Sequence, residues 1–169
     1  MLALQKILRM IDGLSEWSGR LFIWLIVPLT VMVVYEVIAR YFLRSPHIWA
    51  PEITMLFFGP HFMLVAAYTL LHHGHVRIDL VYGRFSPRVR GILDIITYLI
   101  FFFPFCFIML QQGWIYAATS WAQNETSGSA ALPIVPYIKS VIPVTAGMLL
   151  LQGLATFLRS VMLAVRGEE

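Results

Sequence analysis

The chain has 169 residues, of which 59% are hydrophobic and only 12% are charged. Soluble domains carry about a quarter charged residues, so this composition excludes a water-soluble globular protein. The formal net charge is only +3, and the sequence lacks the clustered basic surface that nucleic acid requires. The single cysteine, Cys106, cannot form an intramolecular disulfide. The composition therefore indicates an integral membrane protein without a nucleic-acid partner.

The N-terminal segment is predicted to form a short amphipathic helix at residues 3–16, lying in the cytoplasmic interface of the membrane. Its apolar residues recur at helical spacing and its charged residues occupy the other positions: Leu4, Ile7, Leu8, Ile11 and Leu14 against Lys6, Arg9, Asp12 and Glu16. The apolar run that follows is too long for the core of a signal peptide. The alternative is that this segment extends the first membrane span.

Four apolar segments are long enough to cross a bilayer, which takes about 20 residues. They are predicted at residues 18–42, 49–71, 91–118 and 139–160, with a basic loop at 72–90 and a polar loop at 119–137. Ser86-Pro87 is a typical helix start, because serine accepts from free amides and proline tolerates the first turn. The predicted fold is one all-α membrane domain of four transmembrane helices in two hairpins.

The distribution of basic residues predicts the orientation, because cytoplasmic loops carry an excess of Lys and Arg. With the N-terminus inside, the outer segments hold three of them, namely Arg40, Arg44 and Lys139. The inner segments hold nine: Lys6, Arg9, Arg20, Arg77, Arg84, Arg88, Arg90, Arg159 and Arg166. Both termini are therefore predicted to be cytoplasmic.

Three charged residues are predicted to lie at similar depth near the outer surface. Glu36 and Arg40 are four residues apart and share a helix face, and Glu52 begins the second span after a short loop that includes Trp49. One interpretation is a contact with a partner protein, a lipid headgroup or an anionic solute. The other, which we favour, is a salt bridge that fixes the first hairpin.

His61 is the ionisable residue closest to the middle of a predicted span. An ionisable group at that depth is a functional candidate by default. A neutral imidazole can also satisfy itself with a hydrogen bond to a neighbouring helix, and Pro60 frees a backbone carbonyl nearby. We favour the helix-to-helix bond.

The sequence contains no pattern that indicates catalysis, a metal or a cofactor. His72, His73 and His75 lack carboxylate or thiolate co-ligands at zinc spacing and are better explained as interfacial residues beside Arg77 and Asp79. No nucleophile–base arrangement or phosphate-binding glycine loop is present. The chain is therefore predicted not to be an enzyme.

Three classes of membrane protein remain, and missing residues weaken two of them. A self-contained small multidrug/proton carrier needs an acid deep in a span, whereas Glu36 lies near an end. A haem or quinone anchor needs facing histidines on different helices, and only the second span carries one. The third class, a helper subunit of a transporter, fits spans that hold almost no buried charge.

The motifs in chain order resemble the small membrane subunit, or Q subunit, of tripartite ATP-independent periplasmic (TRAP) transporters. The resemblance is carried by Glu36-x3-Arg40-Tyr41, Trp49-x2-Glu52, Gly74-His75-Val76-Arg77-Ile78-Asp79, Leu80-Val81-Tyr82, Ser86-Pro87, Leu132-Pro133, Ile142-Pro143 and Leu149-Leu150-Leu151-Gln152-Gly153. It covers nearly the whole chain and is greatest for the branch labelled for mannitol, chloroaromatic or 2-oxo-acid uptake.

The resemblance implies a bacterial inner-membrane scaffold whose partners are a large elevator-type membrane subunit (M type), a periplasmic substrate-binding protein and lipid. The large subunit would hold the sodium and substrate sites and import a small carboxylate. Glu36, Arg40, Trp49, Glu52 and His61 are then the predicted assembly residues. Gly74, His75, Arg77 and Asp79 are predicted to fix the cytoplasmic turn.

Overall fold

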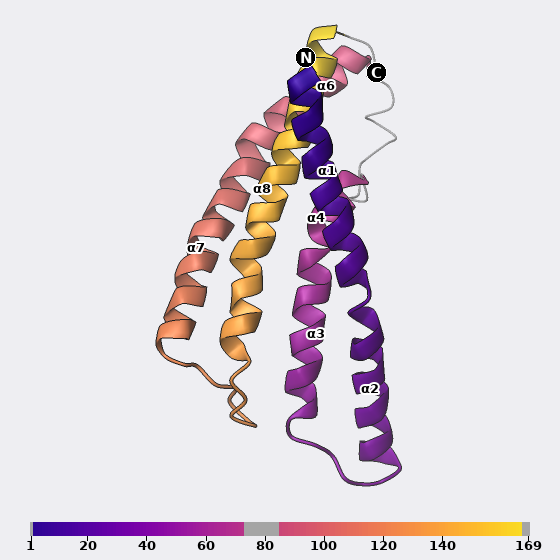
Figure 1. Cartoon of the computed structure of the whole chain (residues 1–169), viewed down its shortest axis with the longest axis vertical. Helices are drawn as coiled ribbons and strands as arrows, with labels where there is room; N and C mark the ends of the chain where they lie inside the picture. The colour runs from indigo at the N-terminus through magenta and orange to yellow at the C-terminus, as the bar shows by residue number, and fades with distance from the viewer. Residues whose placement is uncertain (1, 73–84, 167–169) are drawn as a thin grey trace.

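The computed structural model describes residues 2–72 and 85–166, and every regular element within them is a helix (Figure 1). Four helical rods are long and apolar enough to cross a membrane: Leu4–Tyr41, Ala50–Leu71, Pro87–Ala122 and Val135–Val165. The elements are α1 (Leu2–Ile23), α2 (Ile26–Tyr41), α3 (Ala50–Leu64), α4 (Ala66–Leu71), α6 (Pro87–Thr97), the π-helix η1 (Tyr98–Phe102), α7 (Phe103–Ala122) and α8 (Val135–Arg166).

The rods lie side by side with the two described chain ends together (Figure 1). We call the part of the bundle that holds α1, α4, α6 and the second half of α8 the terminal end. The opposite end, which holds the connections at 42–49 and 123–134, is the loop end. The α2–α3 and α7–α8 hairpins both turn at the loop end.

α8 is the central element, because it packs against α1, α3, α4, α6 and α7. Its buried positions include the small residues Ala146 and Ala155, both 0% exposed. Hydrophobicity alone contributes little to the association of membrane helices. Small residues stabilise such an interface because they let the backbones approach and pack closely. α2, by contrast, packs chiefly on α3 and leaves most of its apolar surface exposed.

Two glycines of α6 and α7 mark close approaches to α8. A Cβ placed on Gly91 of α6 would lie 2.8 Å from both the Ser160 carbonyl oxygen and the Ala164 backbone nitrogen. A Cβ on Gly113 of α7 would lie 2.7 Å from the Ile142 side chain. These positions admit no larger residue without moving the helices, so they set the spacing of the α6, α7 and α8 rods.

The first rod has a joint at Trp24–Leu25, further along than the boundary expected between residues 16 and 18. α1 continues to Ile23, and Gly19 within it allows close packing against Tyr68 of α4. The bonds from Trp24 N–H to the Leu21 carbonyl and from Leu25 N–H to the Phe22 carbonyl span three residues rather than four. Pro28 explains the change, because it lacks the amide that would bond to Trp24 and its ring crowds that carbonyl.

The third rod begins at Pro87 with Ser86 in the N-cap position, as the Ser86-Pro87 pair predicts, although the serine hydroxyl makes no capping bond. Its π-helical turn η1 lies directly before Pro104. There the Phe103 N–H donates to the Tyr98 carbonyl five residues earlier. Such a turn widens the helix where proline cannot donate its own hydrogen bond. The third and fourth rods also extend beyond the predicted spans 91–118 and 139–160 at both ends.

Candidate functional site: polar clusters at the two ends of the bundle

Glu36 is the centre of a polar cluster at the loop end. Its carboxylate is 3.0 Å from Nη2 of Arg40 and 3.4 Å from the backbone N–H of His47. Glu36 is 9% exposed, while the Arg40 side chain is about half exposed. The acid therefore binds the α2–α3 connection back onto α2, and one face of the arginine stays open.

An aromatic stack extends this cluster to Trp49. The rings of Tyr35, His47 and Trp49 contact one another in a triangle, with centroid distances of 5.4 Å for Tyr35–His47, 5.3 Å for His47–Trp49 and 6.2 Å for Tyr35–Trp49. The structure thus brings three of the predicted residues, Glu36, Arg40 and Trp49, to one connection. His47 holds them together, and the sequence reasoning did not single it out.

Glu52 lies in a different arrangement from the one expected, because its carboxylate binds the loop of the second hairpin. It accepts from the Ser127 hydroxyl at 2.5 Å, from the backbone N–H of Ser129 at 3.1 Å, from that of Ala130 at 3.0 Å, and from the Ser129 hydroxyl. No described contact joins Glu52 to Glu36 or Arg40. Glu52 therefore links the two hairpins at the loop end.

The same loop is fixed from its other side by Glu125. The Glu125 carboxylate accepts from Lys139 Nζ at 2.5 Å and from the Ser120 hydroxyl at 2.7 Å. These hydrogen bonds, chiefly the one from Lys139, hold the pKa of Glu125 below its usual value. The Lys139 ammonium also lies 3.9 Å from the centre of the Tyr116 ring. The 123–134 loop is thus anchored to α3, α7 and α8.

A buried amide organises the terminal end. Gln152 of α8 is 0% exposed, and its Oε1 accepts from the Ser15 hydroxyl at 2.7 Å. Its Nε2 donates to Asp12 at 3.2 Å, and Arg159 donates to the other oxygen of Asp12. Sequence reasoning missed this network. The available signal was spacing, since Asp12 and Ser15 share one helix face and Gln152 and Arg159 share another.

A second contact at the terminal end joins α1 to the end of α4. Glu16 accepts from Arg20 at 2.7 Å and from Nε2 of His72 at 2.6 Å. His72 is therefore engaged with a carboxylate of another helix. Within residues 2–72 and 85–166, no group of three or more His, Cys, Asp or Glu could hold a metal ion. His73, Gly74, His75, Arg77 and Asp79 lie outside the described residues.

His61 is positioned against the joint in the first rod. Its Nδ1 lies 3.1 Å from the backbone carbonyl oxygen of Phe22, which can only accept, so Nδ1 carries the proton. Phe22 precedes the joint, where a four-residue backbone bond is missing. The contact is a hydrogen bond from α3 to α1, the kind of bond favoured for His61 from the sequence.

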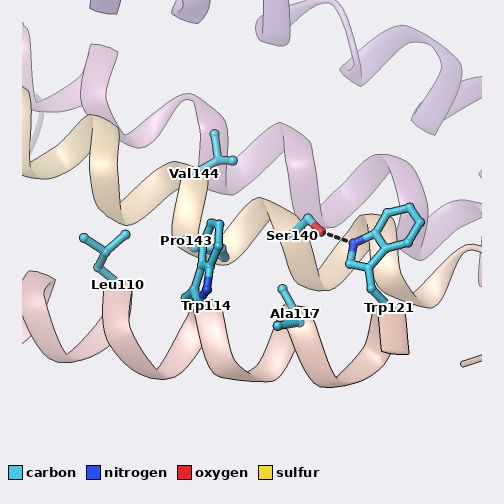
Figure 2. A pocket seen from close by; sticks show the side chains of 8 residues that line it. Leu110, Trp114, Ala117, Trp121, Ser140, Pro143 and Val144 are labelled. Carbon is cyan, nitrogen blue, oxygen red and sulfur yellow. Dashed lines mark hydrogen bonds between the residues drawn. The ribbon is translucent and has the colours of Figure 1, made fainter. Parts of the chain in front are cut away.

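A shallow apolar groove of about 320 Å³ lies between α7 and α8 near the loop end (Figure 2). Its lining includes Leu110, Trp114, Ala117, Trp121, Pro143 and Val144. Trp121 closes one end, where its indole N–H donates to the Ser140 hydroxyl at 2.9 Å (Figure 2). Ser140 in turn donates to the Pro136 carbonyl. The groove offers shape and apolar contact but no group that could act on a substrate.

These clusters define a multi-pass, all-helical membrane protein whose described charged contacts gather at the two ends of the bundle. A family model described as "Tripartite ATP-independent periplasmic transporters, DctQ component" matches residues 29–163. That range covers most of the chain, which therefore belongs to the DctQ family of TRAP transporter small membrane subunits. The family is a transporter component. No curated protein matches the chain.

Proposed function

We propose that this chain is the non-catalytic scaffold subunit of a TRAP transporter in a bacterial inner membrane, with both termini in the cytoplasm. It supports the large elevator-type subunit during sodium-coupled, binding-protein-dependent import of a small organic acid, such as a 2-oxo acid. The start of α1 lies in the cytoplasmic interface. Glu36, Arg40 and Trp49 shape the outer surface on which assembly or docking depends.

One observation carries this proposal beyond family membership: five acids in the described part of the chain bind the protein's own helices and loops. Glu36, Glu52 and Glu125 hold the loop end, and Asp12 and Glu16 hold the terminal end. A carrier of organic anions needs polar groups or broken helices that face a path at mid-membrane. In the described part of the chain, His61 is the ionisable residue near that depth, and it is hydrogen-bonded to the Phe22 carbonyl. The chain is suited to bracing a conduit rather than forming one.

The test is reconstitution of purified components in vesicles with a sodium gradient. The chain alone is expected to accumulate no organic acid. The large subunit with its binding protein is expected to accumulate the acid efficiently only when this chain is present. Sodium-dependent accumulation by the chain alone would overturn the proposal, as would full activity of the large subunit without it.

A further inference from the structure

Two neighbouring glutamines of α7, Gln111 and Gln112, are exposed on the outside of the bundle. A glutamine amide offers two donor hydrogens and an accepting oxygen. No residue within 2–72 and 85–166 makes a hydrogen bond to either side chain. The exposed hydroxyls of the rods behave differently, since Thr30 and Thr119 donate to carbonyls of their own helices. The two amides are therefore polar groups without an internal partner.

The position of the glutamines along α7 places them near the middle of the membrane. α7 ends at Ala122, and Trp121 is the kind of residue that sits at the membrane–water interface. Ten residues of helix separate Gln111 from Trp121, which is about 15 Å. The hydrocarbon core is about 30 Å thick. A glutamine side chain at that depth cannot reach water, and acyl chains offer it no hydrogen bond.

The surrounding surface has the spacing of a helix–helix contact. Cys106, Gly113, Ala117 and Ser120 form the buried face of α7, and Gln111 lies on the opposite face. Steps of three and four residues from it define what we call the Gln111 stripe, all exposed: Pro104, Ile108, Gln111, Ile115, Ala118 and Ala122. A stripe with small residues and a polar residue at its centre is typical of packed membrane helices.

We propose that the Gln111 stripe is the surface against which a transmembrane helix of the large subunit packs. Gln111 within the stripe, and Gln112 at its edge, hydrogen-bond to polar groups of that helix at mid-membrane. The inference rests on the proposed function, which supplies the membrane partner. The exposed face of α2 serves as a contrast, because Val27, Val31, Val34 and Ile38 are purely apolar and lipid is sufficient to cover them.

Site-specific photo-crosslinking in native membranes tests which molecule covers the stripe. A benzoylphenylalanine replaces Ile108 or Ile115, which leaves both glutamines in place, and the control replaces Val34 on α2. All three positions are at least half exposed, at 59%, 52% and 50%. We expect adducts with the large subunit from positions 108 and 115 and none from 34. Adducts only with lipid, or only between two copies of this chain, would overturn the inference.

The contribution of the amides is measured with the double variant Gln111→Leu/Gln112→Leu and the control Val34→Leu. Leucine keeps the side-chain bulk and makes α7 more apolar, so membrane insertion is preserved. We expect association with the large subunit to weaken about tenfold in the double variant, from two lost hydrogen bonds. Unchanged association would overturn the inference. Failure of the wild-type chain to co-purify with any large subunit would instead overturn the proposed function.

Discussion

Gln152 shows how a single polar side chain can be kept at a buried position of a membrane bundle. Both ends of its amide have partners on α1, the Ser15 hydroxyl and the Asp12 carboxylate. Away from water, each of these groups would be costly without the other. The amide therefore fixes the register of α1 against α8, because a shift of one residue would leave three polar groups unpaired.

We expect Gln152→Leu to lower the free energy of unfolding by about 1–3 kcal/mol, because it leaves Ser15 and one oxygen of Asp12 without their partner. The midpoint of thermal unfolding in detergent measures this. Gln5→Leu is the matched control, since Gln5 is exposed near the start of α1 and that exchange leaves the network intact. Equal midpoints for both variants would show that the network does not stabilise the fold.

The lowered pKa of Glu125 predicts that the stability of the protein depends on pH. Its hydrogen bonds to Lys139 and Ser120 lower its pKa from the usual 4.5, so the folded protein binds this proton less readily than the unfolded chain. The contribution of Glu125 to stability is therefore present above about pH 4.5 and is lost as the pH falls through the lower, folded-state pKa.

The measurement is the difference in thermal midpoint between wild type and Glu125→Gln from pH 7 to pH 3. We expect the wild type to be more stable by a constant amount down to about pH 5, and the difference to shrink below it. A difference that grows toward acid pH would contradict the assignment of the Lys139 contact. Glu125 lies in the 123–134 loop, so its protonation is open to the aqueous phase.

At the scale of the helices, hydropathy locates the rods but not their joints. Long apolar runs predicted where four rods would lie. The joint at Trp24–Leu25 follows from Pro28, which lacks the amide that would bond to the Trp24 carbonyl. The π-helical turn lies just before Pro104, whereas Pro143 lies inside the unbroken helix α8. Prolines in the sequence therefore mark possible irregularities, but only the structure shows which of them change the helix.

The α6–α8 crossing leads to a prediction about helix spacing. Gly91→Ala places a methyl group against backbone atoms of α8, which cannot rotate away, so we expect a loss of about 1–3 kcal/mol in stability. Gly13→Ala is the control, because nothing lies within 4 Å of its added Cβ. Alanine at that exposed helical position should stabilise by about 0.5–1 kcal/mol. Thermal unfolding that ranks the two variants in the reverse order would contradict the assigned crossing.

At the scale of the whole molecule, the sequence predicted the membrane class and the pairing of Glu36 with Arg40, because both follow from composition and local spacing. It did not predict the partner of Glu52. A position at the start of the second span is compatible with contact to either hairpin, and only the folded path of the 123–134 loop decides between them. The Gln152 network was missed for the same reason, since its members are separated by more than 130 residues.

Arg40→Ala tests the loop-end cluster in the assembled transporter. Removing the guanidinium leaves the Glu36 carboxylate with only the weaker His47 contact, so we expect lower complex yield and lower uptake. The loss should be partial, because half-exposed ion pairs contribute little individually. The sodium dependence that remains should be that of the large subunit. Uptake by vesicles and the amount of co-purified large subunit are the measurements.

Arg44→Ala is the control for Arg40→Ala, because Arg44 lies at the same end of the bundle with no described ion pair. It removes the same charge without disturbing Glu36. If Arg40→Ala changes neither uptake nor complex yield, the loop-end cluster has no role in assembly or transport. An equal loss in both variants would assign the effect to overall charge rather than to the cluster.

The links between the two hairpins have a consequence for how the chain is made. The ribosome delivers the first hairpin while Asp12, Ser15 and Glu52 still lack their partners, which belong to segments translated later. Until the second hairpin emerges, these groups can be satisfied only by water and lipid headgroups at the two membrane surfaces. A chain cut short before residue 123 should therefore keep the first hairpin but lack every one of these contacts.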